Sequence, residues 1–304
     1  MTDELMIRET TLADVPELAR IRTASYAWFT ASVAAQENWF RTVPEASRPL
    51  RLLAEHEGRV AAFGMANLNL QTSVPNTGAL TLVADPAFRG RGAGSALHSR
   101  LEAHLRDIGA TRVHAWGNDD EATLAFAAHR GFTQGARDRF SQVDTRTLPP
   151  MPELPPDVRL ISLAEAGPRT VYDLDQAASI DEPGDVSYDG TPYDLWLKRY
   201  WESPDQQHHV GTVAVVDGVA ACATFMEADR AAGRGTSTGT CTLRDFRGRG
   251  LAKLVKSAAL RKAAELGIHT AITCNDYENK PMLAVNDWLG YQVCAAEWSL
   301  LKEL

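Results

Sequence analysis

Two segments of the chain carry apolar residues at helical spacing, and the segments have the same length. The first runs from Gly92 to Gly109 and the second from Gly250 to Gly267, so each spans 17 residues between its glycines. The apolar stripes consist of Leu97, Leu101 and Leu105 in the first segment, and of Leu251, Val255, Ala258 and Ala259 in the second. This spacing predicts two helices, and the closing glycines are typical of helix ends.

The pattern around these two helices also repeats. A strand-like run follows each helix, at 111–119 and at 269–276, and both runs end in Asn-Asp. A second predicted helix then closes with glycine and an aromatic residue, Gly131-Phe132 in one half and Gly290-Tyr291 in the other. A repeat of this length predicts two copies of one unit. Because strands and helices mix in each copy, we expect the α/β (α+β) class with a layered sheet.

A proline-rich stretch separates the two copies. Five prolines fall between residues 147 and 158, and proline disfavours both helix and sheet pairing. The stretch therefore predicts a semi-rigid linker at 149–156. The expected domains are residues 1–148 and 157–304, which suits a chain of 304 residues at roughly 150 residues per domain.

Charge and composition bear on the partners of the protein. The formal net charge is -8, so the basic excess that nucleic-acid binding uses is missing. No apolar run approaches the ~18 residues of a membrane span, and the acidic N-terminus lacks the apolar core of a signal peptide. We therefore expect a cytoplasmic protein, a monomer or homodimer, with no nucleic-acid or membrane partner.

The cysteines give no sign of a metal site. Cys222, Cys241, Cys274 and Cys294 form no CxxC pair, and no His/Cys cluster has zinc spacing. We expect reduced thiols and no metal, with the first three as small core residues. An acyl-cysteine at Cys241 is the less favoured alternative.

Arginine and glycine crowd together at the start of each repeated helix. The first stretch reads Arg89-Gly-Arg-Gly92-Ala-Gly94, and the second reads Arg247-Gly-Arg-Gly250-Leu-Ala. Glycines let the backbone approach a ligand closely, and a helix N-terminus with nearby arginines attracts anions. No Gly-Lys-Ser/Thr follows, and the six-residue glycine spacing of dinucleotide sites is absent. The stretch therefore predicts a pyrophosphate site of another kind.

This spacing resembles the Arg/Gln-x-x-Gly-x-Gly/Ala acyl-CoA motif of the GNAT N-acetyltransferases. The resemblance covers both copies and nearly the whole chain. It implies two tandem GNAT-like domains, each a mixed, mostly antiparallel sheet flanked by helices and splayed between its fourth and fifth strands. It also implies acetyl-CoA as cofactor, with one molecule per domain as the expectation.

The resemblance implies which residues contact CoA. The loop amides bind the pyrophosphate, and the fourth strand pairs with the pantetheine arm. Carried onto this chain, these are Val83, Ala84, Asp85, Arg91, Gly92, Ala93, Gly94, Ser95, Ala96 and Asn118 in the first copy, and Cys241, Thr242, Leu243, Arg249, Gly250, Leu251, Ala252, Lys253, Leu254 and Asn275 in the second.

The catalytic groups are less well marked than the CoA loops. Many members of the family carry a tyrosine that acts as general acid four residues before the glycine-aromatic pair, but Ala127 and Asn286 occupy these positions here. Asn286 can donate a hydrogen bond but cannot give up a proton. Carboxylates are missing from both fourth strands, and Glu227, at the end of a neighbouring strand, is the candidate base. A solvated strand end is the alternative interpretation of Glu227.

The front region of the second copy supplies the remaining candidates. Its loop holds five carboxylates that could attract a cationic amine, with Tyr188 as the candidate proton relay, and a solvated loop is the alternative interpretation. These are Asp181, Glu182, Asp185, Asp189 and Asp194. The first copy instead holds aromatic residues, Tyr26, Trp28, Phe29, Trp39 and Phe40, which suit a helix core, an apolar pocket or an interdomain contact.

The resemblance to the GNAT family implies an acyl-CoA-dependent N-acyltransferase. We expect acetyl transfer from acetyl-CoA to a primary amine of a small molecule, either a metabolite or an antibiotic-like compound. Glu227, Asn286 and Tyr188 place the chemistry in the second copy. The alternative from another class is a CoA-binding regulatory or scaffolding protein without turnover, which the missing tyrosine favours.

Overall fold

The computed structural model describes residues 5–179, 181 and 183–304. In the first half of the chain the strands and helices are β1 (Leu5–Glu9), α1 (Val15–Ser25), α2 (Val33–Thr42), β2 (Leu50–His56), β3 (Arg59–Leu68), β4 (Thr77–Ala84), α3 (Ala93–Asp107), β5 (Arg112–Asn118), α4 (Glu121–Ala128) and β6 (Thr133–Asp144). In the second half they are β7 (Val158–Ser162), α5 (Leu163–Ala166), α6 (Pro168–Ser179), α7 (Tyr193–Trp196), the π-helical turn η4 (Leu197–Trp201), β8 (Thr212–Val216), β9 (Val219–Asp229), β10 (Arg234–Thr242), α8 (Leu251–Glu265), β11 (Thr270–Asp276), α9 (Lys280–Leu289) and β12 (Gln292–Glu303).

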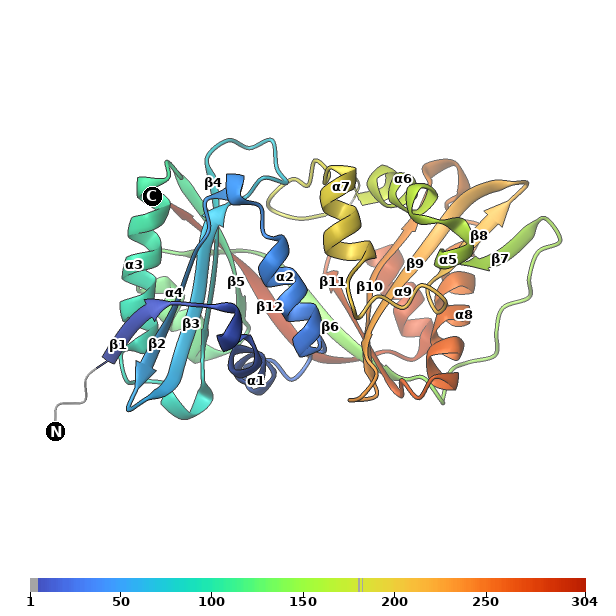
Figure 1. Cartoon of the computed structure of the whole chain (residues 1–304). Coiled ribbons are helices and arrows are strands. Elements are labelled where there is room, and N and C mark those ends of the chain that lie inside the picture. Colours follow the sequence, from blue (N-terminus) through green and yellow to red (C-terminus); the bar gives the residue numbers. More distant parts are fainter. Residues whose placement is uncertain (1–4, 180, 182) are drawn as a thin grey trace.

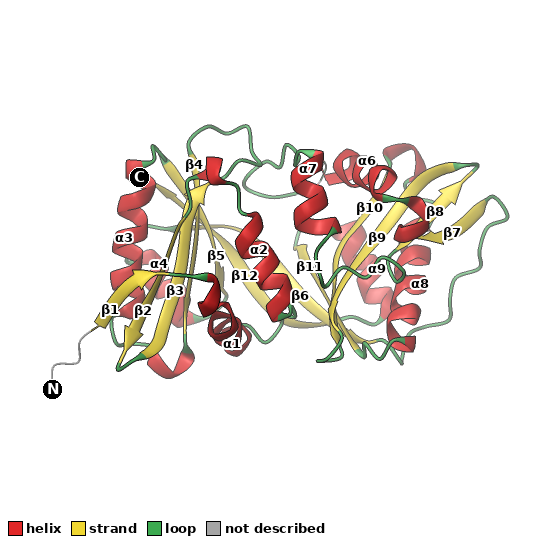
Figure 2. Ribbon diagram, viewed as in Figure 1, coloured by secondary structure: helices red, strands yellow, loops and turns green. Residues whose placement is uncertain are grey.

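The described strands form one sheet that runs through both halves. Their order is β1-β2-β3-β4-β5-β12-β6-β11-β10-β9-β8-β7. Figure 1 shows the two lobes side by side, with β6 and β12 crossing between them, and Figure 2 shows helices on both faces of the sheet. Residues 148–155, in the proline-rich stretch, form neither helix nor strand.

The last strand of each half is exchanged with the other half. β12, from the end of the chain, pairs antiparallel with β5 of the first half, while β6 pairs antiparallel with β11 of the second half. β6 and β12 also pair with each other at the centre of the sheet. The order of elements along the chain follows the predicted repeat, but each lobe is completed by a strand from the opposite copy.

The predicted fold class is confirmed, including the splay within each half. β4 pairs with β5 in parallel only from Thr77 to Leu80, and β10 pairs with β11 in parallel only from Arg234 to Ser237. Beyond these residues the fourth and fifth strands of each half are no longer hydrogen-bonded to each other. The other pairings in the described sheet are antiparallel.

The two repeated helices pack where their apolar stripes predict. Leu97, Leu101 and Leu105 of α3 are fully buried against β2, β3 and β4. In α8 the buried stripe includes Leu251 and Val255 as predicted, whereas Ala258 is only half-buried. Each helix has 15 residues, as the equal glycine intervals require. Burying leucine and valine side chains in this way contributes roughly 1.5–3 kcal/mol each.

The face of the sheet opposite α8 carries α6 and α7. Alternate residues of β9 point to opposite faces, so Cys222 packs in the core with α8 while Ala223 packs in the core with Trp196 of α7. We call the α6 and α7 side the front face and the α8 side the back face. α2 reaches across to the front of the second half, because Asn38 donates a hydrogen bond to the Lys198 carbonyl of η4.

Candidate active site

The two arginine-glycine loops end in the same backbone conformation. Gly92 and Gly250 are the N-caps of α3 and α8 and have φ of 87° and 76°, in the left-handed region that favours glycine. The first bonds within the helices run from Ala96 to Gly92 and from Leu254 to Gly250. The preceding N–H groups have no partner within their helix, so each loop offers unpaired donors to an anion.

A positively charged side chain lies beside the start of each helix, but it comes from a different position in the two halves. In the first half Arg130, beyond α4, donates to the Ser95 hydroxyl at 2.6 Å while its guanidinium lies 3.4 Å from the Phe126 ring centroid. In the second half Lys253 takes the place of Ser95, and its Nζ lies 5.0 Å from the Trp288 ring centroid. Each loop therefore combines backbone donors with a positive side chain, which suits a pyrophosphate.

The motif arginines of the second loop are engaged by acids. Arg247 donates to the Thr242 carbonyl at 3.1 Å and pairs with Asp181, while Arg249 pairs with Asp157. Because their guanidinium groups are held by these partners, the anion site of the second half rests mainly on the backbone amides and Lys253. In the first loop Arg91 lies over the Phe88 ring at 5.4 Å.

The strand edges beside each loop suit a ligand that pairs with backbone. Past Leu80 and Ser237, the β4 and β10 edges that face β5 and β11 have no ladder partner. Val83, Ala84, Cys241 and Thr242 lie on these segments and remain paired on their other side with β3 or β9. The side chain of Asp85 is occupied, because it caps the following turn and pairs with Arg20.

A cavity of about 190 Å³ opens where β10 and β11 part. Residues from several elements line it: Asp138, Pro183, Ser237, Thr238, Gly239, Thr240, Lys256, Thr273, Cys274, Asn275, Asp276, Asn279 and Met282. The pairing of β10 with β9 is interrupted by a bulge between Thr236 and Gly239, at the position of the cavity. Lys256 reaches the cavity from the back helix α8, and Asp138 reaches it from the exchanged strand β6.

Lys256 is a buried amine in the wall of this cavity. Its side chain is 2% exposed, its Nζ donates to the Ser237 hydroxyl at 3.3 Å, and it lies 5.3 Å from the Tyr291 ring centroid. Burial without a carboxylate partner lowers the pKa of Lys256 to about 7. Near neutral pH this amine is therefore present in both its charged and its neutral form.

Glu227 lies on the front face of β9, next to the cavity strand. It stands directly opposite Thr236 of β10, outside the set of cavity-lining residues. Burial, together with the neighbouring Asp205 carboxylate, raises the pKa of Glu227 to about 7. The first half covers this region, because Ser32 donates to Asp205 from its N–H and its hydroxyl, and Thr30 hydrogen-bonds Thr236.

The other two predicted catalytic residues hold neighbouring groups in place. Asn286 of α9 is buried and donates to the side chain of Asn275, a cavity residue, at 2.6 Å. The Oδ1 atom of Asn286 has no hydrogen-bond partner among the described residues. Tyr188 shares a 2.9 Å hydrogen bond with Thr191 and lies outside the cavity lining.

The acidic front loop is largely occupied by protein contacts. Asp181 pairs with Arg244 and Arg247, Asp185 accepts from the Ala136 N–H at 2.6 Å, and Asp189 accepts from the Ser73 N–H. Glu182 lies outside the described residues, and Asp194 is exposed in the first turn of α7. Two of these acids therefore tie the loop to the first half.

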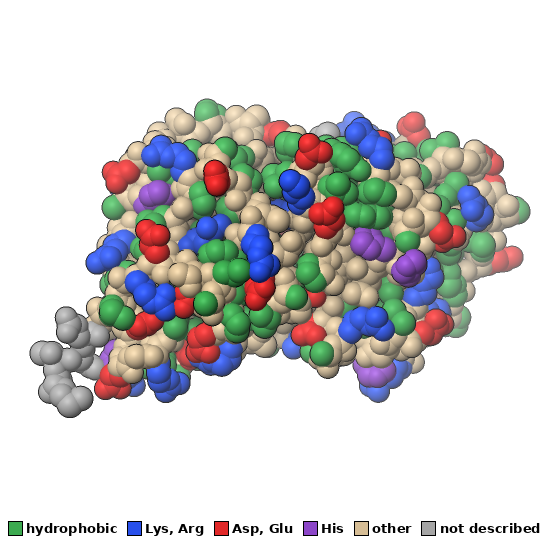
Figure 3. Space-filling model, viewed as in Figure 1, with side chains coloured by type: hydrophobic (Ala, Val, Ile, Leu, Met, Phe, Trp, Pro, Cys, Tyr) green, Lys and Arg blue, Asp and Glu red, His purple; other side chains and the backbone are tan. Residues whose placement is uncertain are grey.

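The aromatic segment of the first copy contributes to the contact between the lobes. Trp28 stacks on Phe140 of the exchanged strand β6 with ring centroids 3.8 Å apart, and Trp39 lies under the Arg199 guanidinium of η4 at 4.3 Å. Of the interpretations open from sequence, the interdomain contact is the one these two rings fit. Figure 3 shows that charges of both signs are intermixed on this side of the molecule.

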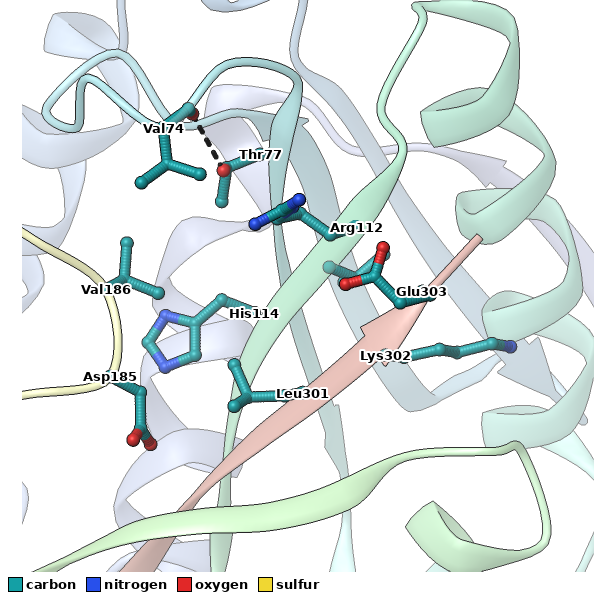
Figure 4. Close-up of a pocket in the computed structure, with 10 residues that line it drawn as sticks. Val74, Thr77, Arg112, His114, Asp185, Val186, Leu301, Lys302 and Glu303 are labelled. Carbon is teal, nitrogen blue, oxygen red and sulfur yellow. Dashed lines mark hydrogen bonds between the residues drawn. The ribbon is translucent and has the colours of Figure 1, made fainter.

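A second cavity, of about 150 Å³, lies in the first half. Figure 4 shows His114 of β5 between Val186 and Asp185 of the front loop and Leu301 of β12, with Arg112 and Glu303 above. Nε2 of His114 hydrogen-bonds the Ser299 hydroxyl at 3.1 Å, and burial lowers the pKa of this histidine. The cavity sits at the paired ends of β4 and β5, where Thr77 stands opposite Arg112.

Three polar residues of the central region were not predicted from sequence. Lys256 sits within an amphipathic helix, so periodicity alone suggested no function for it. Asp138 and Glu297 lie on strands whose partners depend on the exchange, and no local pattern marks them. Cys222 and Cys241 are buried, as core residues should be, and burial raises the pKa of Cys222 to about 12.

The repeated fold and the two matched arginine-glycine loops are those of a tandem acetyltransferase of one family. The profile of the acetyltransferase (GNAT) family matches residues 15–132 and 171–291. The chain therefore belongs to this family, and it is an N-acetyltransferase by that membership. The structure contains no helix, among the described residues, long and apolar enough to span a membrane.

The chain is similar to one curated protein and to several solved structures of this family. A mycothiol acetyltransferase from Nocardioides sp. (strain ATCC BAA-499 / JS614) is 28% identical over 228 residues, which are 70% of this chain and 76% of that protein. The tandem GNAT protein from the clavulanic acid biosynthesis pathway has a TM-score of 0.78 at 19% identity, with 99% of this chain and 98% of that chain covered. A GCN5-related N-acetyltransferase from Sphaerobacter thermophilus has a TM-score of 0.76 at 18% identity, with 100% and 96% covered. These two structures share the fold.

Proposed function

We propose that this protein transfers an acetyl group from acetyl-CoA to a primary amine of a small molecule, and that the second half performs the transfer. The observation that carries the proposal is the cavity between β10 and β11. Polar side chains from β10, β11, the helix α8 that the Gly250 loop begins, and the exchanged strand β6 line this cavity. Transfer needs polar groups aimed at the reacting atoms, whereas binding needs only a loop and a strand edge.

Acetyl-CoA supplies the acyl group as a thioester, and its pyrophosphate fits the amides at the start of α8 with Lys253 beside them. Of the chain's own groups, Glu227 is the base that takes a proton from the acceptor amine. Its pKa near 7 leaves it partly ionised at neutral pH, where it can accept that proton. Tyr188 and Asn286 are supporting residues, of which Asn286 orients Asn275.

Lys256 takes the role of proton donor that the missing tyrosine leaves open. The amide of Asn286 cannot release a proton, but Lys256 lines the cavity and has a pKa near 7. Its Nζ can therefore donate a proton inside the cleft near neutral pH. The neighbouring Ser237 hydroxyl, which accepts from Nζ at 3.3 Å, fixes the direction of the side chain.

The experiment that tests this function measures thiol release from acetyl-CoA in the presence of a panel of primary amines. Gly250→Val should abolish turnover, because a branched side chain at φ of 76° disturbs the loop amides. Gly92→Val should leave turnover measurable. If Gly92→Val abolishes turnover and Gly250→Val retains it, the first half performs the chemistry. Acetyl-CoA binding without amine-dependent thiol release from any member of the panel would favour the non-catalytic alternative.

A further inference from the structure

The strand exchange creates a row of polar side chains across the centre of the sheet. In register, Asp276 of β11 stands opposite Asp138 of β6, Asp138 stands opposite Glu297 of β12, and Glu297 stands opposite Asn118 of β5. Residues directly opposite on neighbouring strands share one face. The row therefore extends from the fifth strand of the second half to the fifth strand of the first half.

Asp138 and Glu297 are equivalent residues of the two copies. Asp138 lies six residues after the Phe132 that closes its α4 helix, and Glu297 lies six residues after the Tyr291 that closes α9. The exchange sends Asp138 into the lobe of the second half, where it lines the cavity beside Cys274 and accepts a 3.5 Å hydrogen bond from its thiol. Glu297 lies beside the end of β5 in the first lobe.

These carboxylates lack a positive partner in the protein. Glu297 is 8% exposed, and among residues 5–179, 181 and 183–304 no arginine or lysine pairs with Glu297 or Asp138. The neighbouring arginines on β6 alternate to the back face, where Arg137 pairs with Asp119 and Arg139 pairs with Asp287. Like charges directly opposite one another oppose folding, so this arrangement favours an added cation.

Lys256 lines the same cavity as Asp138, but its Nζ hydrogen-bonds Ser237 and does not pair with either carboxylate. Tyr26, between α1 and α2, is close to Glu297, while Asp185 of the front loop and Asp276 of β11 act on Asp138. Burial and its neighbouring acids raise the pKa of Asp138, and burial together with Asp138 raises the pKa of Glu297 to about 8. The missing positive charge at a cavity wall matches the ammonium form of an amine.

We propose that Asp138, supplied by the first half through the exchanged strand β6, binds the ammonium group of the acceptor in the second-half cleft, with Glu297 as its charge-coupled partner. This rests on the proposed function for the identity of the ligand as an acceptor. It makes the catalytic cleft composite: the second half alone lacks the residue that recognises its substrate's charge. Glu297 is a positioning residue, since it acts through Asp138.

The test follows the melting temperature of the full chain with 1,4-diaminobutane as the probe. The neutral 1,4-butanediol is the ligand control, at matched ionic strength and pH 8. The diamine should raise the melting temperature of the wild type and of Asp144→Asn, a control change at the half-exposed far end of the same strand. The diol should have no such effect, and Asp138→Asn should abolish the difference between diamine and diol. An equal response of Asp138→Asn and wild type, or a wild type that does not distinguish the diamine from the diol, would overturn the proposal.

A second measurement needs no ligand. Because the pKa of Glu297 is raised on folding, the folded chain holds the extra proton and its stability falls as pH rises from about 5 to 8. Glu297→Gln should remove part of that fall, so its melting temperature should drop less than that of the wild type across this range. The melting temperature of Asp144→Asn should drop as much as that of the wild type. A Glu297→Gln variant whose melting temperature depends on pH as that of the wild type does would contradict the claim that Glu297 is buried beside Asp138 without a positive partner. Failure of acetyl transfer with the amine response intact would refute the proposed function and leave Asp138 as a residue that binds an ammonium group.

Discussion

Replacing Lys256 by methionine should make the protein more stable at pH 7 and less pH-dependent above it. The change keeps an unbranched side chain of similar length in the wall of the cavity but removes a buried amine. In the unfolded chain a lysine has a pKa of about 10.5, and in the folded chain that of Lys256 is about 7. Between these values the unfolded chain binds more protons than the folded one, so this residue makes stability rise with pH.

The size of the effect follows from the two pKa values. Each pH unit between them changes the free energy of unfolding by at most about 1.4 kcal/mol. Near pH 7 the folded lysine is itself half-protonated, so the step from pH 7 to pH 9 gives about 2 kcal/mol. From pH 7 to pH 9 the free energy of unfolding of the wild type should therefore rise by about 2 kcal/mol more than that of Lys256→Met.

Urea unfolding followed by tryptophan fluorescence at pH 7, 8 and 9 measures this difference, and contributions from groups common to both proteins cancel in it. Lys198→Met is the control, because Lys198 is exposed and its ammonium stays hydrated in the folded chain. A difference between wild type and Lys256→Met that stays constant from pH 7 to pH 9 would refute the claim that Lys256 is buried without a countercharge.

Three further predictions concern the cleft, the loops and the exchanged strands. Glu227→Gln should lower the acetylation rate by roughly 100-fold or more while CoA binding persists, and it should remove the loss of rate that the wild type shows below about pH 7. Asp229→Asn, which changes a turn-capping residue, is the control. A near-normal rate for Glu227→Gln would show that Glu227 has only a structural role. Calorimetry should find two CoA sites per chain, and Gly92→Val and Gly250→Val should each remove the site in their own half. Gly218→Val, which is equally strained at φ of 84° but lies in a hairpin turn, should keep both sites. A single site in the intact protein would contradict the claim for one of the two halves. Because β6 and β12 each complete the other lobe, fluorescence and circular dichroism should report one coincident unfolding transition, and two separated transitions would show that the lobes fold independently.

The sequence by itself determined the local elements and the paired arginine-glycine loops. Equal glycine intervals and leucine stripes act over a few turns of helix, so α3 and α8 could be predicted from residue order alone. The same holds for Gly92 and Gly250, whose left-handed backbone is a local requirement of the strand-to-helix turn. Glu227 was identified from its strand end, but the contacts of Thr30 and Ser32 with its neighbours Thr236 and Asp205 could not be seen there.

Only the tertiary structure decided how the two copies share their strands. A strand's alternating pattern shows that one face is buried, but the identity of its neighbour depends on contacts far away in the chain. β6 would fit its own copy equally well by pattern, yet it pairs with β11, more than 120 residues further along. For that reason Asp138 looked like one more strand residue in the sequence, and it stands in the wall of the other copy's cleft in the folded protein. Lys256 is a parallel case, because the burial that shifts its pKa is created by the sheet and α9 packing around α8.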